Sequence, residues 1–493
     1  MKTIGELAAL VKGAEVIGSR DASITGIEHD SRKVGKGGLF VCIPGIHVDG
    51  HDFIPQVAGQ GAAAILTTRD IEPPEGMAVL KVPELNEALD AIVPFFHDYP
   101  AQSMRVIGIT GTNGKTTTSY ITRAILRNAG FKVGLIGTIQ IMVEEETLPI
   151  HNTTPDVVEL QNLLAMMRDK GMDYVVMEVS SHALDQNRVA GIEFDTAVFT
   201  NLTQDHLDYH KTLENYKLAK AKLFGLLSKG GKKQGKTAVV NIDDGAGETM
   251  LAHAECRHLT YAIHRAADLR AEDISVLPGG ARFRLSGDFG SMDLQLHITG
   301  IFNVYNVMSA VGAALAEGIS PDVIQKALQD FVSVPGRFEL VNEGQDFSVI
   351  VDYAHTPDGV ENVLRTARQI ARRHIITVFG CGGDRDRTKR PIMGRMAAEL
   401  SDTVIATSDN PRTEDPEFIL GQVEEGVKEA IGGKHHECIV DRRTAIFRAV
   451  ELAQKDDIVV ILGKGHEDYQ ILKDRTIHFD DREVAREAIR GKK

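Results

Sequence analysis

The amino-acid sequence predicts an α/β protein of three domains, in which the central and C-terminal domains are each built on a mostly parallel sheet. A chain of 493 residues is too long for one ordinary hydrophobic core. Short apolar runs alternate with helical segments along most of the chain, as in parallel sheets. Polar or Pro-Gly breaks lie near residues 98 and 333, so we expect domains at 1–98, 99–333 and 334–493.

The predicted strands support this division. The N-terminal domain has short apolar runs between glycine- and aspartate-containing turns, which favour a small α/β module. We expect its strands within 37–44 and 62–68. We expect the central strands within 105–110, 132–138, 173–180, 194–202 and 237–243. The C-terminal strands are expected within 348–355, 375–383, 402–410 and 457–467, and each ends in a polar or glycine-containing loop, as in a doubly wound sheet.

Composition excludes several classes of protein. The net charge of -14 opposes binding of nucleic acid or of an anionic membrane. The four cysteines show no CxxC spacing, so neither a zinc site nor a disulfide framework is indicated. The sequence contains no signal-peptide pattern and no run of about 20 apolar residues. We therefore expect a cytoplasmic enzyme with no membrane insertion.

A glycine-rich segment predicts a phosphate-binding loop. Gly111 and Gly114 precede Lys115 and Thr116 at a strand-to-helix junction, where backbone N–H groups and the helix dipole can hold phosphates. Lys115 would neutralise phosphate charge, and the Thr116 hydroxyl would ligate Mg2+. The strict P-loop spacing is not met, because Ile109 occupies its first glycine position. A glycine-rich turn that only caps a helix is the alternative.

Further polar residues follow the neighbouring strands. Glu178 and His206 are plausible magnesium ligands, although each could equally be a helix cap or a satisfied polar group. Lys220 lies on the apolar face of a predicted helix, at helical spacing from Tyr216 and Phe224. A buried neutral amine can react with carbon dioxide to give a carbamate, but the pattern alone favours a lysine whose stem is buried and whose end reaches solvent.

These and later motifs resemble those of the Mur ligase family. The shared segments cover nearly the whole chain. They are 111–117 (GTNGKTT), 178–182 (EVSSH), 205–208 (DHLD), 216–220 (YKLAK), 300–306 (GIFNVYN), 336–337 (GR), 352–357 (DYAHTP), 380–386 (GCGGDRD), 409–412 (DNPR) and 463–467 (GKGHE).

The resemblance implies a three-domain architecture, with a central sheet like that of P-loop ATPases and a Rossmann-like C-terminal domain. It implies that Lys115, Glu178, His206 and Lys220 take part in catalysis, with Lys220 carbamylated. The implied magnesium ligands are Thr116, Glu178, His206 and the carbamate of Lys220. The implied ATP contacts are Gly111, Thr112, Asn113, Gly114, Lys115, Thr116, Thr117, Asn303, Asn306, Arg337 and His355.

The resemblance also implies two further substrates. UDP-N-acetylmuramoyl-L-alanyl-D-glutamate would contact Ser31, His47, Asn152, Thr153, Thr154, Ser180, Gln186 and Arg188, although Ser31 could equally belong to an ordinary turn. meso-2,6-Diaminopimelate would contact Arg385, Asp409, Asn410, Pro411, Arg412, Gly463 and Glu467. Arg412 would meet its distal carboxylate, Arg385 its proximal carboxylate, and Gly463 and Glu467 its distal ammonium group.

The implied reaction is ATP-dependent ligation of diaminopimelate to the D-glutamate γ-carboxylate through an acyl phosphate, in peptidoglycan precursor synthesis. Two alternatives stay open at this point. Another ligase of the same superfamily, such as a folylpolyglutamate synthase, would share the phosphate loop but differ in its peptide-binding loops. A P-loop regulatory or transport ATPase would require a partner interface.

Overall fold

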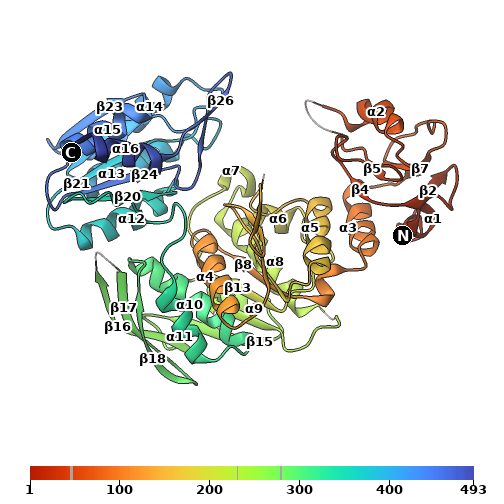
Figure 1. Ribbon diagram of the computed structural model, residues 1–493, viewed down its shortest axis with the longest axis horizontal. Helices are drawn as coiled ribbons and strands as arrows, with labels where there is room; N and C mark the ends of the chain where they lie inside the picture. Colours follow the sequence, from red (N-terminus) through yellow and green to blue (C-terminus); the bar gives the residue numbers. More distant parts are fainter. Residues whose placement is uncertain (45–47, 151, 230, 278–279, 493) are drawn as a thin grey trace.

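The computed structural model describes residues 1–44, 48–150, 152–229, 231–277 and 280–492. Three large sheets follow one another along the chain. Figure 1 shows the N-terminal and C-terminal parts on opposite sides of the central part. The three-domain α/β architecture is therefore confirmed, while the boundaries at 98/99 and 333/334 stay predictions. Both fall between sheets.

The N-terminal module contains a five-stranded sheet of order β2-β7-β6-β5-β4, parallel except at β2. Its core continues onto α5 of the central part. At that junction, His29 Nε2 lies 2.8 Å from Asp156 Oδ2, the carboxylate that caps α5. The module's strands are β1 (Lys2–Thr3), β2 (Glu15–Ile17), β3 (Ser23–Ile24), β4 (Ile27–Glu28), β5 (Leu39–Val41), β6 (Ala64–Thr67) and β7 (Ala78–Lys81). Its helices are α1 (Ile4–Ala8), α2 (Ile54–Gly59) and α3 (Leu85–Phe96).

The central sheet has eleven strands in the order β11-β10-β9-β12-β8-β13-β14-β15-β16-β17-β18. Strands β9 to β16 in this order are parallel. Of these, β8, β9, β12, β13 and β14 were predicted, and β15 and β16 were not. The strands are β8 (Arg105–Thr110), β9 (Val133–Ile136), β10 (Ile141–Val143), β11 (Glu146–Leu148), β12 (Tyr174–Glu178), β13 (Thr196–Phe199), β14 (Thr237–Asn241), β15 (Arg257–Ala262), β16 (Leu269–Leu277), β17 (Gly280–Gly287) and β18 (Gly290–Leu296).

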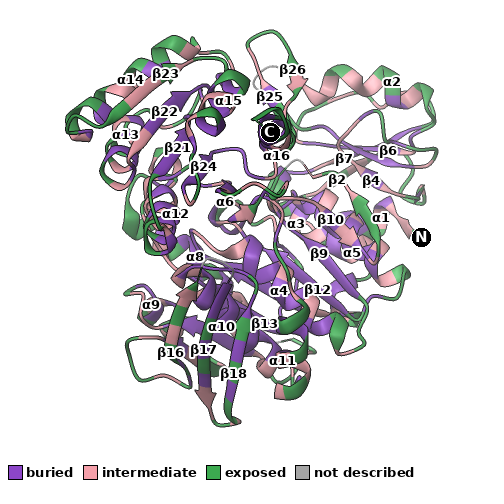
Figure 2. Ribbon diagram, turned by 60° about the vertical axis from the view of Figure 1, so that its left-hand side comes forward, coloured by how far each residue is buried: buried purple, intermediate pink, exposed green. Residues whose placement is uncertain are grey.

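Antiparallel strands extend both edges of this sheet, and the sequence did not predict them. In β17 and β18 buried residues alternate with exposed ones, because only one face is covered. In contrast, β8, β12 and β13 are buried almost throughout, and Figure 2 shows buried residues concentrated on these central strands. The central helices are α4 (Lys115–Asn128), α5 (Val157–Asp169), α6 (Ser181–Asp185), α7 (Leu207–His210), α8 (Leu213–Ser228), α9 (Gly247–Ala252), α10 (Ile301–Ala316) and α11 (Pro321–Asp330).

The C-terminal sheet has the order β19-β20-β24-β21-β22-β23 and is parallel except at β19. Its strands are β19 (Glu339–Leu340), β20 (Ser348–Asp352), β21 (Ile375–Phe379), β22 (Thr403–Thr407), β23 (His435–Ile439) and β24 (Ile458–Leu462). A separate hairpin is formed by β25 (Tyr469–Ile471) and β26 (Thr476–His478). Its helices are α12 (Pro357–Ile370), α13 (Lys389–Leu400), α14 (Pro416–Ala430), α15 (Arg442–Leu452) and α16 (Asp481–Lys492). Across the described ranges, none of the helices combines the length and apolar character that crossing a membrane requires.

Candidate active site

The predicted phosphate loop connects β8 to α4 at the carboxyl edge of the central sheet. Gly114 has a φ of +87° and begins the helix, a conformation that glycine adopts without strain. A side chain at Gly111 would collide with Thr200, and one at Gly114 would collide with the amide of Asn306. The loop therefore requires glycine at both positions, because neighbouring elements pack directly against its backbone.

Asn201, which follows β13, holds the loop in place. Its Oδ1 accepts a hydrogen bond from the Asn113 N–H at 2.9 Å, and its Nδ2 donates to the Asn113 carbonyl at 3.1 Å. The Thr200 hydroxyl donates to the same carbonyl at 2.6 Å. Sequence reasoning assigned no role to Asn201, since the pairing joins residues 88 positions apart.

Two lysines meet at one carbonyl oxygen of the loop. Lys115 Nζ donates to Gly111 O at 2.9 Å, and Lys220 Nζ donates to the same oxygen at 2.8 Å. Lys220 is only 1% exposed, so the alternative of a lysine that reaches solvent is wrong. Burial, with a smaller contribution from the charge of Lys115, lowers the pKa of Lys220 well below its ordinary value. Lys220 thus supplies an amine that can lose its proton beside the phosphate loop.

Glu178 is a fully buried carboxylate at the end of β12, the strand beside β8. Its Oε2 accepts hydrogen bonds from the hydroxyls of Thr116 at 3.1 Å and Thr138 at 2.9 Å. Its Oε1 accepts one from the Thr138 N–H at 2.9 Å. Carboxylate and hydroxyl oxygens are the ligands that Mg2+ prefers. Thr138, which was not predicted, orients this carboxylate.

His206 lies at the start of α7 with a φ of +54°. Its ring is 4.8 Å from the ring of His182, and its Nε2 is 3.4 Å from Asp205 Oδ2. Burial lowers the pKa of His206 to about 4, although Asp205 opposes this shift. A neutral imidazole retains the lone pair that metal coordination needs. Within the described ranges, no three side chains of His, Cys, Asp or Glu gather as a ready metal site, so the predicted set depends on Thr116 and a modified Lys220.

The residues predicted to lie near adenine belong to α10. Asn303 Nδ2 donates to Thr299 O at 2.8 Å, and Asn306 Nδ2 donates to Asn303 Oδ1 at 3.0 Å. Asn306 also contacts the phosphate loop at Gly114. The amides therefore form a short chain that ends at the loop. Thr112 and Thr117 are buried at the loop and in the first turn of α4.

The C-terminal part contacts this site at two points. Arg337 Nη2 donates to Thr116 Oγ1 at 3.1 Å, while Arg337 Nε is buried without a hydrogen-bond partner among the described residues. Asp358, in the first turn of α12, accepts a hydrogen bond from Asn113 Nδ2 at 2.5 Å. The ring of His355 contacts that of Tyr353 at an interplanar angle of 60°, with ring centroids 4.7 Å apart. Asp358 was not predicted, because only the folded chain brings α12 to the phosphate loop.

The residues predicted to bind the muramoyl dipeptide form a second network beside Glu178. Thr154 Oγ1 donates to Glu178 O at 3.0 Å and accepts from the Ser180 N–H at 3.0 Å. Arg188 donates to Thr154 O at 3.0 Å and to Gln186 Oε1 at 2.6 Å.

Thr153 joins this network through the hydroxyl of Thr138 at 3.2 Å, and Asn152 is exposed next to it. Ser31 lies in the N-terminal module, where its hydroxyl is 3.5 Å from Gln56 Oε1. His47 lies outside the described residues.

Two loops of the C-terminal sheet bring the predicted diaminopimelate residues together. The Gly383 N–H donates to Asn410 O at 2.9 Å, and the Pro411 carbonyl leaves no space for a side chain at Gly383. Arg412 Nη1 donates to Gly383 O at 2.9 Å. The exposed Arg385 lies two residues after this contact. Both guanidinium groups therefore belong to one pair of interlocked loops.

A third loop completes this cluster. Gly463 has a φ of +118°, and a side chain there would collide with the carboxylate of Asp409. Glu467 Oε2 accepts a hydrogen bond from Asn410 Nδ2 at 2.9 Å. Burial raises the pKa of Glu467, an effect that the charge of Lys464 opposes. Sequence reasoning quoted the GKGHE segment but gave Lys464 no role.

Comparisons with known proteins agree with this geometry. Profiles described as the Mur ligase family catalytic domain, the Mur ligase middle domain and the Mur ligase glutamate ligase domain match residues 23–104, 109–314 and 336–465. A Bacillus cereus protein named UDP-N-acetylmuramoyl-L-alanyl-D-glutamate--2,6-diaminopimelate ligase is 48% identical over 97% of this chain and 96% of its own length. A Bacillus licheniformis protein of the same name is 47% identical over 99% of both chains. This chain belongs to the Mur ligase family.

Solved structures of Mur ligases and their relatives agree with the fold. A structure titled with the same diaminopimelate ligase name covers 99% of both chains, with 33% identity and a TM-score of 0.68. A Mycobacterium tuberculosis folylpolyglutamate synthase matches 76% of this chain and 92% of its own at 19% identity, with a TM-score of 0.64, which shows a shared fold alone. As a Mur ligase, the chain uses ATP to form an amide bond.

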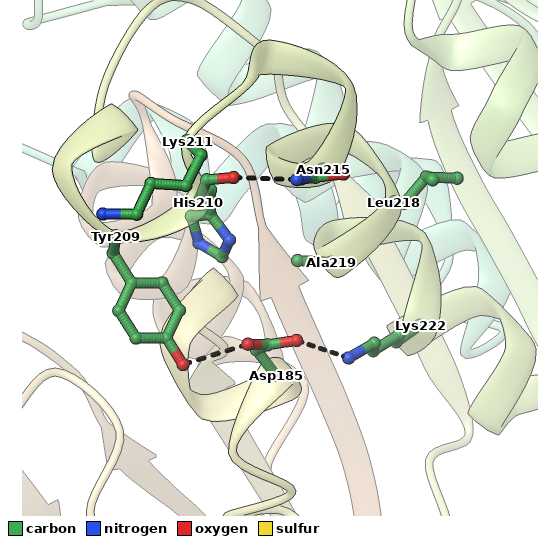
Figure 3. A pocket seen from close by; sticks show the side chains of 8 residues that line it. All are labelled: Asp185, Tyr209, His210, Lys211, Asn215, Leu218, Ala219 and Lys222. Atoms are coloured by element: carbon green, nitrogen blue, oxygen red, sulfur yellow. Dashed lines mark hydrogen bonds and ion pairs between the residues drawn. The ribbon is translucent and has the colours of Figure 1, made fainter.

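A cavity of about 390 Å³ lies beside this Mur ligase site rather than in it. It is bordered by α6, α7 and α8, and Figure 3 shows Asp185 between Tyr209 and Lys222 on its wall. The Tyr209 hydroxyl donates to Asp185 at 2.9 Å, and Lys222 donates to the same carboxylate at 2.6 Å. Because these groups satisfy one another, the cavity wall contributes mainly to holding α6 against α8.

Proposed function

We propose that this Mur ligase joins meso-2,6-diaminopimelate to the D-glutamate γ-carboxylate of UDP-N-acetylmuramoyl-L-alanyl-D-glutamate during peptidoglycan precursor synthesis. The observation that carries the proposal is the similarity, over nearly the whole chain, to ligases of that name. The match to a folylpolyglutamate synthase covers less of the chain and is much weaker in sequence. Because the reaction consumes ATP, we place it in the cytoplasm.

The chemistry begins with activation of the carboxylate. A carboxylate oxygen attacks the γ-phosphorus of ATP, the bond between the β- and γ-phosphates breaks, and ADP leaves. The neutral amine of diaminopimelate then attacks the carbonyl carbon of the acyl phosphate. The amine nitrogen loses one proton, and the C–O bond to phosphate breaks as phosphate leaves from the tetrahedral intermediate. Lys115 and Arg337 are the cations beside the loop, and they would stabilise charge on the transferred group. Asn303, Asn306 and His355 would bind the nucleoside part.

Magnesium would be held by Thr116, Glu178, His206 and a carbamate on Lys220. The buried hydroxyl and carboxylate oxygens and the neutral imidazole fit a hard divalent cation. Formation of the carbamate requires a neutral lysine: the amine nitrogen bonds to the carbon of CO2 and one proton is released. The depressed pKa of Lys220 supports this modification. When bound, the ion would neutralise phosphate charge.

Diaminopimelate would lie between the three C-terminal loops. We assign its distal carboxylate to Arg412, its proximal carboxylate to Arg385, and its distal ammonium group to Gly463 and Glu467. Asp409 and Asn410 support these side chains from the same loop as Pro411 and Arg412. On the other side, the network of Thr154, Ser180, Gln186 and Arg188, together with Asn152 and Thr153, would bind the dipeptide. Ser31 and His47 would meet the UDP end.

The decisive experiment measures ADP release by the purified protein with each substrate omitted in turn. We expect release to require both the UDP-muramoyl dipeptide and diaminopimelate, and mass spectrometry to detect the tripeptide product. An unchanged rate of ADP release when the UDP-muramoyl dipeptide is omitted would contradict the proposal. Turnover with glutamate and a folate in place of these substrates would indicate the folylpolyglutamate alternative.

A further inference from the structure

Lys464 is a lysine with no solvent exposure in the third of the loops just described. Its ammonium nitrogen is 3.2 Å from Asn410 Oδ1 and 3.2 Å from Glu467 Oε2. It also lies 5.5 Å from the ring centroid of Tyr469. A buried ammonium is costly unless charged or polar partners surround it, so this arrangement requires a reason.

The partners of Lys464 are themselves linked. Asn410 Oδ1 accepts hydrogen bonds from Lys464 Nζ and from the Ile471 N–H at 2.9 Å, while Asn410 Nδ2 donates to Glu467 Oε2. Two donors therefore fix the oxygen end of the amide, and the Glu467 carboxylate fixes its nitrogen end. Glu467 Oε2 in turn accepts hydrogen bonds from both Asn410 Nδ2 and Lys464 Nζ. The three side chains form a closed triangle in which each holds the other two.

Among the described residues of the C-terminal part, two other cations are fully buried, and they differ from Lys464 in their partners. Arg390 pairs with Glu414 at 2.9 Å, and Arg442 pairs with Asp481 at 2.6 Å. Both carboxylates lie outside the proposed substrate set, so these pairs hold the fold together. The partners of Lys464 are instead two residues that we assign to diaminopimelate.

We propose that Lys464 is a positioning residue for diaminopimelate, which orients Asn410 and keeps the Glu467 carboxylate charged and aimed at the substrate's distal ammonium group. This inference rests on the proposed function. Glu467 needs such a partner, because Asp409 and the buried surroundings both favour its uncharged form. An uncharged Glu467 would lose its attraction for an ammonium group. Lys464 would act through Glu467 without touching the substrate.

The test uses Lys464→Met, which keeps most of the length of the side chain but removes its charge and its hydrogen bonds. Loss of the charge-assisted contact between Glu467 and the substrate's distal ammonium group would cost about 2 kcal/mol, which corresponds to about 30-fold in affinity. We expect KM for diaminopimelate to rise about 30-fold, while kcat and KM for ATP change less than about threefold. Lys434→Met is the matched control, since Lys434 also donates to carbonyls of this part of the chain, at 2.8 Å to Ala398 and 2.9 Å to Ser401. It should leave KM for diaminopimelate unchanged.

A second comparison separates positioning from a general structural role. Glu467→Gln removes one of the two groups through which Lys464 would act and leaves Asn410, so adding Lys464→Met to it should raise KM by clearly less than about 30-fold further. The double variant does not leave a Glu467 carboxylate without its Lys464 partner, which keeps the test valid if Lys464→Met alone does not fold. Wild-type KM in Lys464→Met, or a full 30-fold rise in the Glu467→Gln background, would overturn the inference. If turnover by the wild-type protein does not depend on diaminopimelate, the proposed function is overturned instead.

Discussion

Replacement of Lys220 by methionine should separate stability from activity. The side chain is 1% exposed, and its nitrogen donates to Gly111 O at 2.8 Å. Methionine has a similar length and no charge, so it can fill the same space on the buried face of α8. Because we propose that the lysine serves the metal site and not packing, we expect Lys220→Met to fold normally and to be nearly inactive.

The magnitudes favour this outcome. Loss of one neutral hydrogen bond costs about 1 kcal/mol, whereas replacing the buried amine by an apolar group removes a desolvation cost of about 1–3 kcal/mol. The unfolding free energy should therefore stay level or rise. Removal of one preorganised electrostatic group from an active site commonly costs about 2.7–4 kcal/mol of transition-state stabilisation, or about 100-fold or more in kcat. Activity and stability should change in opposite directions.

The assay measures ADP release with all three substrates, together with thermal unfolding of the same samples. Lys222→Met is the matched control: Lys222 lies one half-turn further along α8 and pairs with Asp185 at the surface. It should keep wild-type kcat. Lys220→Ala should regain part of its activity with added acetate or formate, since a short carboxylate can occupy the place of the carbamate. Full activity of Lys220→Met without additives would refute the reasoning.

Three further outcomes follow from the same geometry. Gly114→Ala should lose most ATP affinity, because the φ of Gly114 is +87° and the added methyl group would collide with Asn306. Gly130 is the control, since its φ of +92° is similar but open space surrounds it. Gly130→Ala should show only the backbone cost of about 1–2 kcal/mol in thermal unfolding. We expect the wild type to prefer diaminopimelate over lysine by at least about 30-fold in kcat/KM, and Arg412→Ala should reduce this preference. If the ratio of kcat/KM for the two amino acids is unchanged in Arg412→Ala, Arg412 does not select between them. Burial lowers the pKa of His206 to about 4, below the ordinary value of about 6.5, so the unfolded chain binds more protons than the folded chain between these pH values. The free energy of unfolding should therefore fall as pH decreases from about 6.5 to about 4. His206→Gln should reduce this pH dependence in unfolding experiments.

The sequence was sufficient for features that depend on local chemistry. Continuous apolar runs predicted β8, β12 and β24, because strands buried on both faces leave no alternation. The spacing of Tyr216 and Phe224 predicted the buried face of α8 correctly. The antiparallel β17 and β18 escaped prediction, since their alternating pattern gives a weaker signal than a continuous apolar run.

Features that depend on distant partners could not be predicted in the same way. The pattern placed Lys220 on an apolar face but could not show that its nitrogen ends at Gly111 O, 109 residues away in sequence. The same holds for Asn201 and Asp358, whose partner in the folded chain is Asn113. Lys464 follows an apolar strand directly, which could have indicated burial, but its role depends on a loop 54 residues earlier. Assignment of these residues requires the tertiary fold.

The groups proposed to bind the nucleotide are already paired with one another, which has a consequence for domain arrangement. Lys115 donates to loop carbonyls, Arg337 donates to Thr116, and Thr116 donates to Glu178. Phosphate and metal must replace these partners, so binding exchanges hydrogen bonds instead of creating new buried charges. Arg337 comes from the C-terminal part, as does Asp358, which holds Asn113 of the same loop. Nucleotide binding therefore acts on the Arg337 contact, which joins the first turn of α4 to the C-terminal part. By thermodynamic linkage, the position of that part would in turn alter nucleotide affinity, which would tie ATP binding to the placement of the amino acid that we propose the C-terminal loops bind.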